Sequence, residues 1–268
     1  LLMRRIEPNS IALSVWSPPY HVGKKYEDGQ SYDSWVKMLQ TVISLHGAVL
    51  KPGGFVAINI SDILCFSDNR RQLAELLGCS EQTVERRLHG NNIRGGKYNT
   101  QTRVKIVGGM LEDMALGAGL FPYDRRIWVK DAAWVNSNWT TNSYRSVDEF
   151  EYVYIFWKPG ETTIDRKRLS NEEWSEWGSR GVWNIPSVRK NDDHEAKFPV
   201  ELPRRIIKLL SDEGDIVLDC FMGSGTTAVA ALAESRHYIG IEKEKKYVQL
   251  AKKNVQTFSL QAAQSVIV

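Results

Sequence analysis

The chain has 268 residues, of which 42% are hydrophobic and 25% are charged, and its formal net charge is +3. This composition is typical of a globular protein with one large domain, or one domain with an insertion. No apolar run approaches the roughly 18 residues that a membrane helix needs, and the first residues, 1–5, lack the apolar core of a signal peptide.

The cysteines and histidines exclude two further classes of protein. Cys65, Cys79 and Cys220 are widely spaced and suggest no disulfide framework, so we expect a reducing, cytoplasmic location. The five histidines show no metal-ligand spacing, and we therefore expect no metal site.

The first strong element is a buried strand over residues 11–16, which leads into Ser17-Pro18-Pro19-Tyr20. The two prolines end the strand and hold Ser17 and the nearby carbonyls rigidly at its carboxyl end, where open α/β sheets bind ligands. Rigid acceptors beside an aromatic ring suit a planar ligand that carries an amino group. The alternative is a plain turn with a Pro-Pro stop.

The next segments alternate between helix and strand. Residues 21–30 form a polar, glycine-bearing loop, and apolar residues at helical spacing predict a helix over 32–50. Residues 51–54 (Lys-Pro-Gly-Gly) should stop this helix, and residues 55–60 read as a second buried strand.

Residues 66–105 break this rhythm. A helical pattern, a glycine turn, a Ser80 cap and a second helical pattern resemble a helix-turn-helix, with Gln82, Thr83, Arg86 and Arg87 facing outward. The segment has eight basic and four acidic residues, a net charge of +4 against +3 for the whole chain. An ordinary helical hairpin with a solvated basic face is the alternative.

The regular pattern resumes after this segment. We expect a helix over 104–116, followed by an antiparallel pair of strands near 123–130 and 152–158 at one sheet edge. Residues 159–196 are polar and lack a regular pattern. Most of the tryptophans lie between residues 128 and 183, and core packing is the first expectation for each of them.

A glycine-rich loop dominates the last part of the chain. A helix over 198–210 precedes a short strand that ends at Asp219, and Cys220-Phe221-Met222-Gly223-Ser224-Gly225-Thr226 then leads into another helix. Such a strand–loop–helix unit offers free N–H groups to a nucleotide-type ligand. The next strand ends at Glu242, which is placed to accept hydrogen bonds from ribose hydroxyls. A final helix is expected over 247–258.

Together, S-P-P-Y and D-C-F-M-G-S-G-T-T resemble the DNA amino-methyltransferases that use S-adenosylmethionine. The order of the motifs, catalytic first and cofactor loop last, is similar to the β group of this family. The resemblance implies an α/β fold with a Rossmann-like class I methyltransferase sheet, mostly parallel with an antiparallel edge pair, a circularly rearranged motif order and a helical insertion. The family has one more strand before residue 11, so we expect that the chain begins part-way through the natural protein.

The resemblance also assigns roles to residues and segments. Ser17, Pro18, Pro19 and Tyr20 become the catalytic residues. The residues assigned to the cofactor are Asp219, Phe221, Gly223, Ser224, Gly225, Thr226 and Glu242. The expected organisation is a catalytic half at 1–65 and 106–158, the insertion at 66–105, a short target-recognition region at 159–196 and a cofactor-binding half at 197–268. Gln82, Thr83, Arg86 and Arg87 would then contact DNA.

The function implied is methylation of a flipped base in double-stranded DNA. Members with Ser before Pro-Pro-Tyr are mostly cytosine-N4 enzymes, so Ser17 favours cytosine N4. The alternatives are an adenine-N6 enzyme of the same group and a non-catalytic DNA-binding protein on this fold. The sequence leaves open whether the protein is a homodimer and whether a cognate restriction endonuclease accompanies it.

Overall fold

The architecture is described from a computed structural model of the chain. The structure describes residues 2–20, 31–65, 74–75, 78–83, 103–132, 146, 148–162, 165–188 and 198–265. Of the helices within these ranges, none combines the length and apolar character required to cross a membrane.

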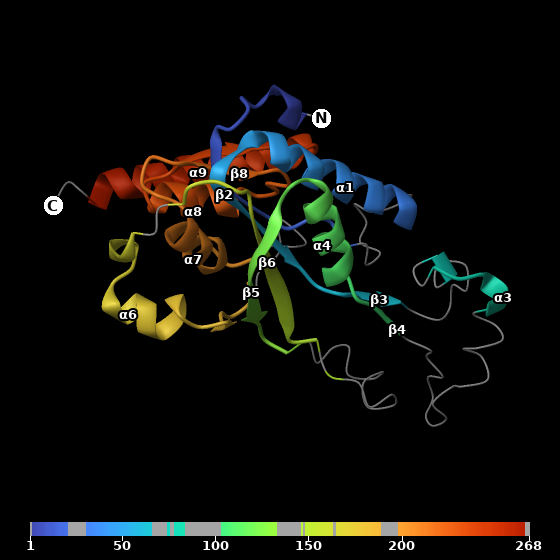
Figure 1. The fold of residues 1–268 in the computed structure, drawn as a ribbon. Coiled ribbons are helices and arrows are strands. Elements are labelled where there is room, and N and C mark those ends of the chain that lie inside the picture. Colours follow the sequence, from blue (N-terminus) through green and yellow to red (C-terminus); the bar gives the residue numbers. More distant parts are fainter. Residues whose placement is uncertain are drawn as a thin grey trace.

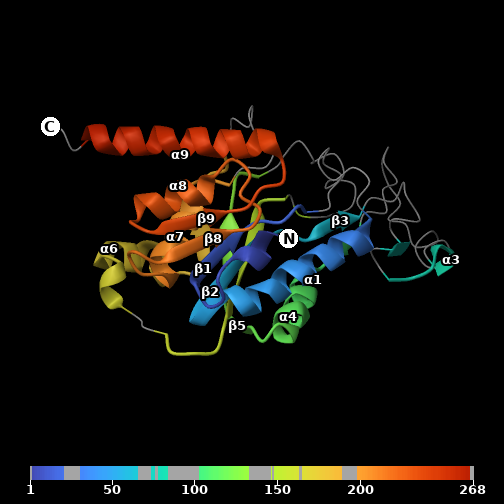
Figure 2. The same cartoon turned by 90° about the horizontal axis from the view of Figure 1, so that it is seen from above.

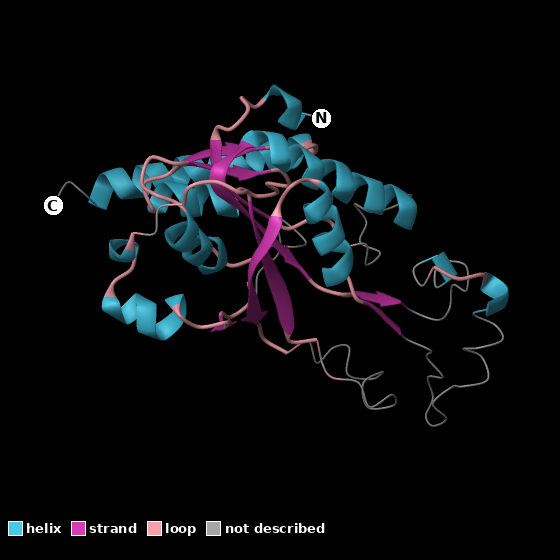
Figure 3. Ribbon diagram, viewed as in Figure 1, coloured by secondary structure: helices cyan, strands magenta, loops and turns pink. Residues whose placement is uncertain are grey.

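A seven-stranded sheet forms the centre of the molecule (Figures 1 and 3). In spatial order its strands are β7 (Val182–Asn184), β5 (Phe121–Val129), β6 (Phe150–Trp157), β2 (Leu50–Ile60), β1 (Ile11–Trp16), β8 (Ile216–Asp219) and β9 (His237–Gly240). β6 is antiparallel to both of its neighbours, and the other neighbouring strands pair in parallel. The mostly parallel sheet with an antiparallel pair is therefore confirmed, although β7 covers the outer side of β5, so the pair does not form the edge.

Helices cover both faces of this sheet (Figure 2). The principal helices are α1 (Tyr32–Val49), α4 (Gly108–Gly117), α7 (Glu201–Leu210), α8 (Thr226–Ala233) and α9 (Lys245–Ser265). One apolar core joins α1 and α4 to the sheet, and a second core on the opposite face includes α7 and α8. α9 lies beside α8 and extends beyond the helix expected from the sequence. The 3-10 helix Leu2–Arg5 precedes β1, and α7 begins three residues later than expected.

β1 and α1 follow directly from the sequence. All six residues of β1 are buried, which explains why the strand reads as a continuous apolar run between parallel neighbours. The hydroxyl of Ser31 caps α1 by accepting the N–H of Ser34 at 3.2 Å.

The expected stop at residues 51–54 is wrong, because this segment is part of β2. α1 ends at Val49, and β2 begins at the next residue. Gly53 has a φ of +81°, and a Cβ there would lie 1.9 Å from the carbonyl oxygen of Glu161. A shift in the pairing of β1 with β2 between Ile11 and Leu13 accommodates this irregular stretch. A Pro-Gly-Gly sequence therefore forms the bulged start of a strand instead of a turn.

The helix expected over 104–116 is also wrong at its beginning. Arg103–Lys105 forms strand β4, which pairs antiparallel with β3 (Ile63–Cys65), and α4 starts at Gly108. A carboxylate oxygen of Asp62 accepts the N–H of Val107 at 2.9 Å, which fixes the chain just before α4. The β3–β4 ladder thus joins the two ends of the expected insertion, a long-range pairing that no local pattern reveals.

The segment 159–196 contains more regular structure than expected. Its described part includes the short helices Arg166–Arg168, Asn171–Glu173 (α6) and Trp174–Gly178, and strand β7 extends the sheet beside β5. The rings of Trp177 and Trp183 meet edge to face, and both side chains are buried, as is Trp128. This aromatic packing, which is tertiary, stabilises a segment whose sequence looks irregular. Trp174 is 57% exposed and does not belong to this core.

Candidate active site

The two motifs singled out in the sequence lie at the same edge of the sheet. β1 and β8 are parallel neighbours in which Ser14 pairs with Leu218, so Ser17 and Phe221 lie at the same level beyond the strand ends. The ring centroids of Trp16 and Phe221 are 5.4 Å apart, which brings the two segments into direct contact. The structure therefore brings the predicted catalytic residues beside the predicted cofactor loop.

Ser17-Pro18-Pro19-Tyr20 is fixed by contacts from two neighbouring elements. The indole nitrogen of Trp35, near the start of α1, donates to the Pro19 carbonyl at 2.6 Å. The Ser17 hydroxyl donates to the Tyr20 hydroxyl at 2.9 Å. Among the described residues, no donor reaches the Pro18 carbonyl. The Pro18 carbonyl and the remaining lone pairs of Ser17 Oγ are thus acceptors that the described part of the chain does not use.

The Tyr20 hydroxyl is bound to the neighbouring strands β2 and β6. It donates to Glu151 Oε2 at 2.6 Å, and the backbone oxygen and Oδ1 of Asn59 lie 3.3 and 3.2 Å away. Glu151 also accepts from Lys130 Nζ at 2.8 Å. These contacts hold the orientation of the Tyr20 ring. The sequence included Glu151 in a segment similar to the family but gave it no role, because its partner Tyr20 is 131 residues away.

A buried histidine supports the aromatic contact beneath the site. The ring of His46 stacks on Trp16 with centroids 5.6 Å apart, and its Nε2 lies 2.8 Å from the Ser14 hydroxyl. Burial lowers the pKa of His46 to about 4, against the opposing effect of the Val42 carbonyl at Nδ1. Since Val42 O can only accept, Nδ1 carries the proton of the neutral ring, which packs as an uncharged part of the core.

The glycine-rich loop after β8 has the backbone geometry of a ligand cradle. Gly225 has a φ of +85°, and a Cβ there would approach the Cβ of Ala251 in α9 to 3.0 Å, so only glycine fits without strain. The loop turns directly into α8 at Thr226. Asn254 of α9 donates to the Ser224 carbonyl at 2.9 Å and so holds the loop from the other side.

Two carboxylates border this loop. Glu242 accepts the N–H of Gly223 at 2.9 Å through Oε2 and the N–H of Glu244 at 2.8 Å through Oε1. Each oxygen keeps a second lone pair for ribose hydroxyls. Burial raises the pKa of Asp219 to about 7, and the negative charge of Glu242 acts in the same direction. The N–H of Phe221, which donates to Asp219 at 2.9 Å, opposes this rise.

The predicted DNA-binding residues are only partly described. Gly78 has a φ of +64°, and the Ser80 hydroxyl accepts the N–H of Thr83 at 3.1 Å, which gives the expected glycine turn and cap before Glu81–Thr83 (α3). Gln82 is exposed and Thr83 is half-buried. Arg86 and Arg87 lie outside the described residues, and DNA contact by this segment stays a prediction.

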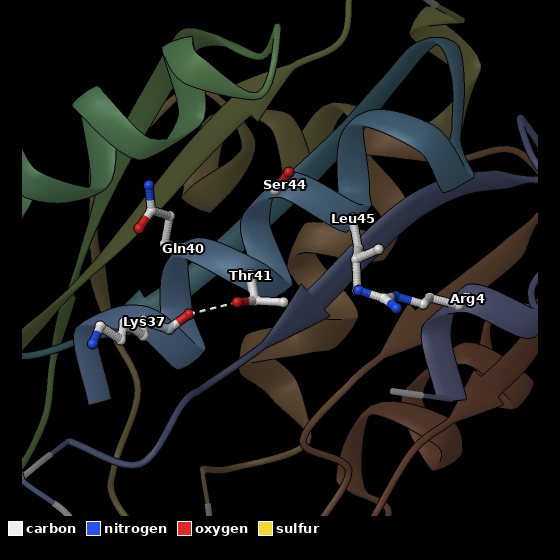
Figure 4. A pocket seen from close by; sticks show the side chains of 6 residues that line it. All are labelled: Arg4, Lys37, Gln40, Thr41, Ser44 and Leu45. Atoms are coloured by element: carbon white, nitrogen blue, oxygen red, sulfur yellow. Dashed lines mark hydrogen bonds between the residues drawn. The ribbon is translucent and has the colours of Figure 1, made fainter. Parts of the chain in front are cut away.

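A hollow of about 330 Å³ lies elsewhere, over the outer surface of α1 and next to the 3-10 helix Leu2–Arg5 (Figure 4). Its lining residues are Arg4, Lys37, Gln40, Thr41, Ser44 and Leu45. The Thr41 hydroxyl is already bonded within the helix, to the Lys37 carbonyl at 2.6 Å. None of the predicted site residues lines this hollow. Within the described ranges there is also no cluster of three or more His, Cys, Asp or Glu side chains that could hold a metal ion.

The sheet order and the two motifs at one edge define a class I methyltransferase fold in its circularly rearranged form. The sequence matches the DNA methylase family over residues 11–253. The chain is 61% identical to the type II methyltransferase M.BglI of Bacillus subtilis, over 96% of this chain and 83% of that protein. The chain therefore belongs to the DNA methylase family, and the resemblance inferred from its motifs is confirmed.

Two further comparisons extend this result. The chain is 26% identical to the DNA adenine methyltransferase YhdJ of Escherichia coli (strain K12), over 98% of this chain and 82% of that protein. Among solved structures, TTHA0409 from Thermus thermophilus, a DNA modification methylase complexed with S-adenosyl-L-methionine, superposes with a TM-score of 0.69. That alignment has 25% identity and covers 96% of this chain and 90% of the other.

Proposed function

We propose that this protein methylates the exocyclic N4 amine of cytosine in double-stranded DNA and uses S-adenosylmethionine as the methyl donor. The observation that carries the proposal is the contact between the S-P-P-Y segment and the glycine-rich loop, through the rings of Trp16 and Phe221 at 5.4 Å. An amine acceptor and a methyl donor held at these two segments would be adjacent, and such positioning supplies much of the rate of a transfer reaction.

The residues of the loop fit this cofactor. The left-handed backbone at Gly225 and the start of α8 allow a ligand to approach the main chain closely. Glu242 has lone pairs for two ribose hydroxyls. The aromatic ring of Phe221 borders the edge at which the target amine would lie. The cofactor, when bound, supplies a methyl group that is already activated on a sulfonium.

The chain's own contribution is to prepare the amine. The lone pair of an exocyclic amine is delocalised into the base, so the nitrogen is a poor nucleophile. Ser17 Oγ and the Pro18 carbonyl accept the two amino hydrogens and draw the nitrogen toward a tetrahedral geometry. The Pro19 carbonyl does not compete for this role, because Trp35 already donates to it. The ring of Tyr20, whose hydroxyl is fixed by Glu151, stacks on the base.

The choice of base rests on Ser17. Serine before Pro-Pro-Tyr favours cytosine N4, and a hydroxyl with one outward-facing acceptor suits one hydrogen of the amine. Adenine N6 is the second candidate, since a relative at 26% identity is named a DNA adenine methyltransferase.

The DNA partner and the biological setting are part of the proposal. The target base leaves the stack to reach the edge of the sheet, and the basic segment 66–105 contacts the flanking duplex. Because M.BglI is named a type II methyltransferase, we extend to this chain the role of modification enzyme in a restriction–modification system.

Nucleoside analysis tests this function. DNA that carries no methylated bases would be incubated with the protein and S-adenosylmethionine, digested to nucleosides and analysed by mass spectrometry. N4-methylcytosine is the expected product. N6-methyladenine as the only product would establish the second candidate. No product, together with no cofactor binding by calorimetry, would leave a non-catalytic DNA-binding protein.

A further inference from the structure

A chain of hydrogen bonds links Ser17 to a buried ion pair on the neighbouring strands. It runs from Ser17 Oγ to the Tyr20 hydroxyl at 2.9 Å, from there to Glu151 Oε2 at 2.6 Å, and from Glu151 Oε1 to Lys130 Nζ at 2.8 Å. Glu151 is only 7% exposed. A buried carboxylate with such partners is costly to hold, and its position next to the S-P-P-Y segment calls for a reason.

The direction of this chain follows from counting protons. The Tyr20 hydroxyl has one proton and is surrounded by three oxygens that can only accept: Glu151 Oε2 and two oxygens of Asn59. The orientation of the Asn59 amide is fixed, because its nitrogen donates to the Tyr152 carbonyl at 3.2 Å. Tyr20 therefore gives its proton away from Ser17 and accepts the proton of the Ser17 hydroxyl.

Lys130 keeps the end of the chain negative. Burial disfavours the charge of Lys130, but the ion pairs with Glu151 and, at 3.4 Å, with Asp148 outweigh it and raise the pKa of Lys130. A lysine that stays charged stabilises the ionised form of Glu151, which can only accept. With its own proton committed to Tyr20, Ser17 Oγ can face the cleft only with its lone pairs.

We propose that Glu151 is a positioning residue that fixes the direction of this hydrogen-bond chain, so that Ser17 meets the target amine as an acceptor. The inference rests on the proposed role of Ser17, and it applies to either base. If the end of the chain could donate, Tyr20 could turn its proton toward Ser17. The Ser17 proton would then face the amino hydrogens, which would repel it.

The test replaces Glu151 by an isosteric group that can donate. Glu151→Gln is expected to lower the single-turnover rate of methyl transfer to unmethylated plasmid DNA by about 10- to 100-fold, less than the loss of a direct transition-state contact. The KM for DNA and the Kd for S-adenosylmethionine should change less than about twofold, because the substituted group touches neither ligand. Glu149→Gln, which removes an exposed carboxylate from the segment just before β6, is the matched control and should keep the parent rate.

A double-mutant cycle separates this role from a general structural one. If Glu151 acts only through the Tyr20 hydroxyl, then Tyr20→Phe combined with Glu151→Gln should be no slower than Tyr20→Phe alone. Losses that multiply in the double variant, or a Glu151→Gln enzyme with the parent rate, would overturn the inference. Tyr20→Phe alone keeps the ring and is expected to be slower than the parent, so a parent rate in this variant would also overturn it if Glu151→Gln does not fold.

Ser17→Ala distinguishes failure of this inference from failure of the proposed function. A Ser17→Ala enzyme at the parent rate would remove the acceptor role on which the inference depends. A slow Ser17→Ala enzyme beside a fast Glu151→Gln enzyme would leave the proposed function intact and refute only the role of Glu151.

Discussion

The carboxylate of Glu242 makes the sharpest prediction about the cofactor site. It accepts two backbone N–H groups, from Gly223 at 2.9 Å and from Glu244 at 2.8 Å, and its free lone pairs are available to the ribose. Glu242→Ala removes all of these acceptors. A hydrogen bond to a charged group contributes about 1.5–3 kcal/mol, so cofactor binding should weaken by that amount. This corresponds to a Kd for S-adenosylmethionine that is about 10- to 150-fold higher.

Calorimetric titration with S-adenosylmethionine measures this directly. Glu244→Ala is the matched control: it removes an exposed carboxylate from the same turn and retains the backbone N–H that Glu242 accepts. Its Kd should stay at the parent value. Thermal unfolding without cofactor is recorded in parallel, because losing the contact with Gly223 should also lower the Tm. If Glu242→Ala lowers the Tm but leaves the Kd within about twofold of the parent, Glu242 only supports the loop and does not bind the ribose.

Three further predictions concern the core, the glycine loop and the DNA-binding segment. Unfolded His46 gains its proton near pH 6.5 and folded His46 only near pH 4, so acid should reduce the free energy of unfolding by about 2 kcal/mol between pH 7 and pH 5. Asp219, with a folded pKa of about 7, has the opposite dependence, so the effect is measured by urea unfolding as the difference between the parent and His46→Gln; no difference in pH slope would contradict a neutral buried ring. Gly225→Ala places a side chain at a φ of +85° and should weaken cofactor binding, and an unchanged calorimetric Kd would show that the loop tolerates it. Arg86→Ala and Arg87→Ala should each reduce the salt slope of DNA binding by about one if they contact phosphates, whereas loss of about 1–3 kcal/mol at the cognate site alone would indicate base contacts; a double variant that binds like the parent at every salt concentration would refute both.

The parts of the fold that the sequence predicted are those with strong local signals. β1 and β8 are short buried strands between parallel neighbours, so they read as uninterrupted apolar runs. Both are followed by residues with special backbone requirements, Pro18-Pro19 after one and the glycines after the other. These punctuation signals located the two motifs, and the parallel pairing of the strands then brought them together.

The parts that were missed depend on contacts between distant segments. The bulged start of β2 needs the Glu161 carbonyl beside Gly53, and β4 exists because it pairs with β3. β7 is held by packing of Trp183 against Trp177. The link from Tyr20 to Glu151 spans 131 residues and joins two strands, so no spacing rule could have found it.

Transfer of a labelled methyl group by the parent and by Ser17→Ala tests the catalytic role of the S-P-P-Y edge. DNA without methylated bases would be treated with cofactor deuterated at its methyl group, and the labelled nucleosides would be quantified by mass spectrometry in a single turnover. Ser259→Ala, at an exposed position on α9, is the control for loss of a hydroxyl elsewhere. We expect the parent and Ser259→Ala to place the label on cytosine N4, and Ser17→Ala to do so about 100- to 1,000-fold more slowly with an unchanged Kd for the cofactor. A Ser17→Ala enzyme that transfers the label at the parent rate, or a parent enzyme that labels only adenine N6, would contradict the proposed mechanism.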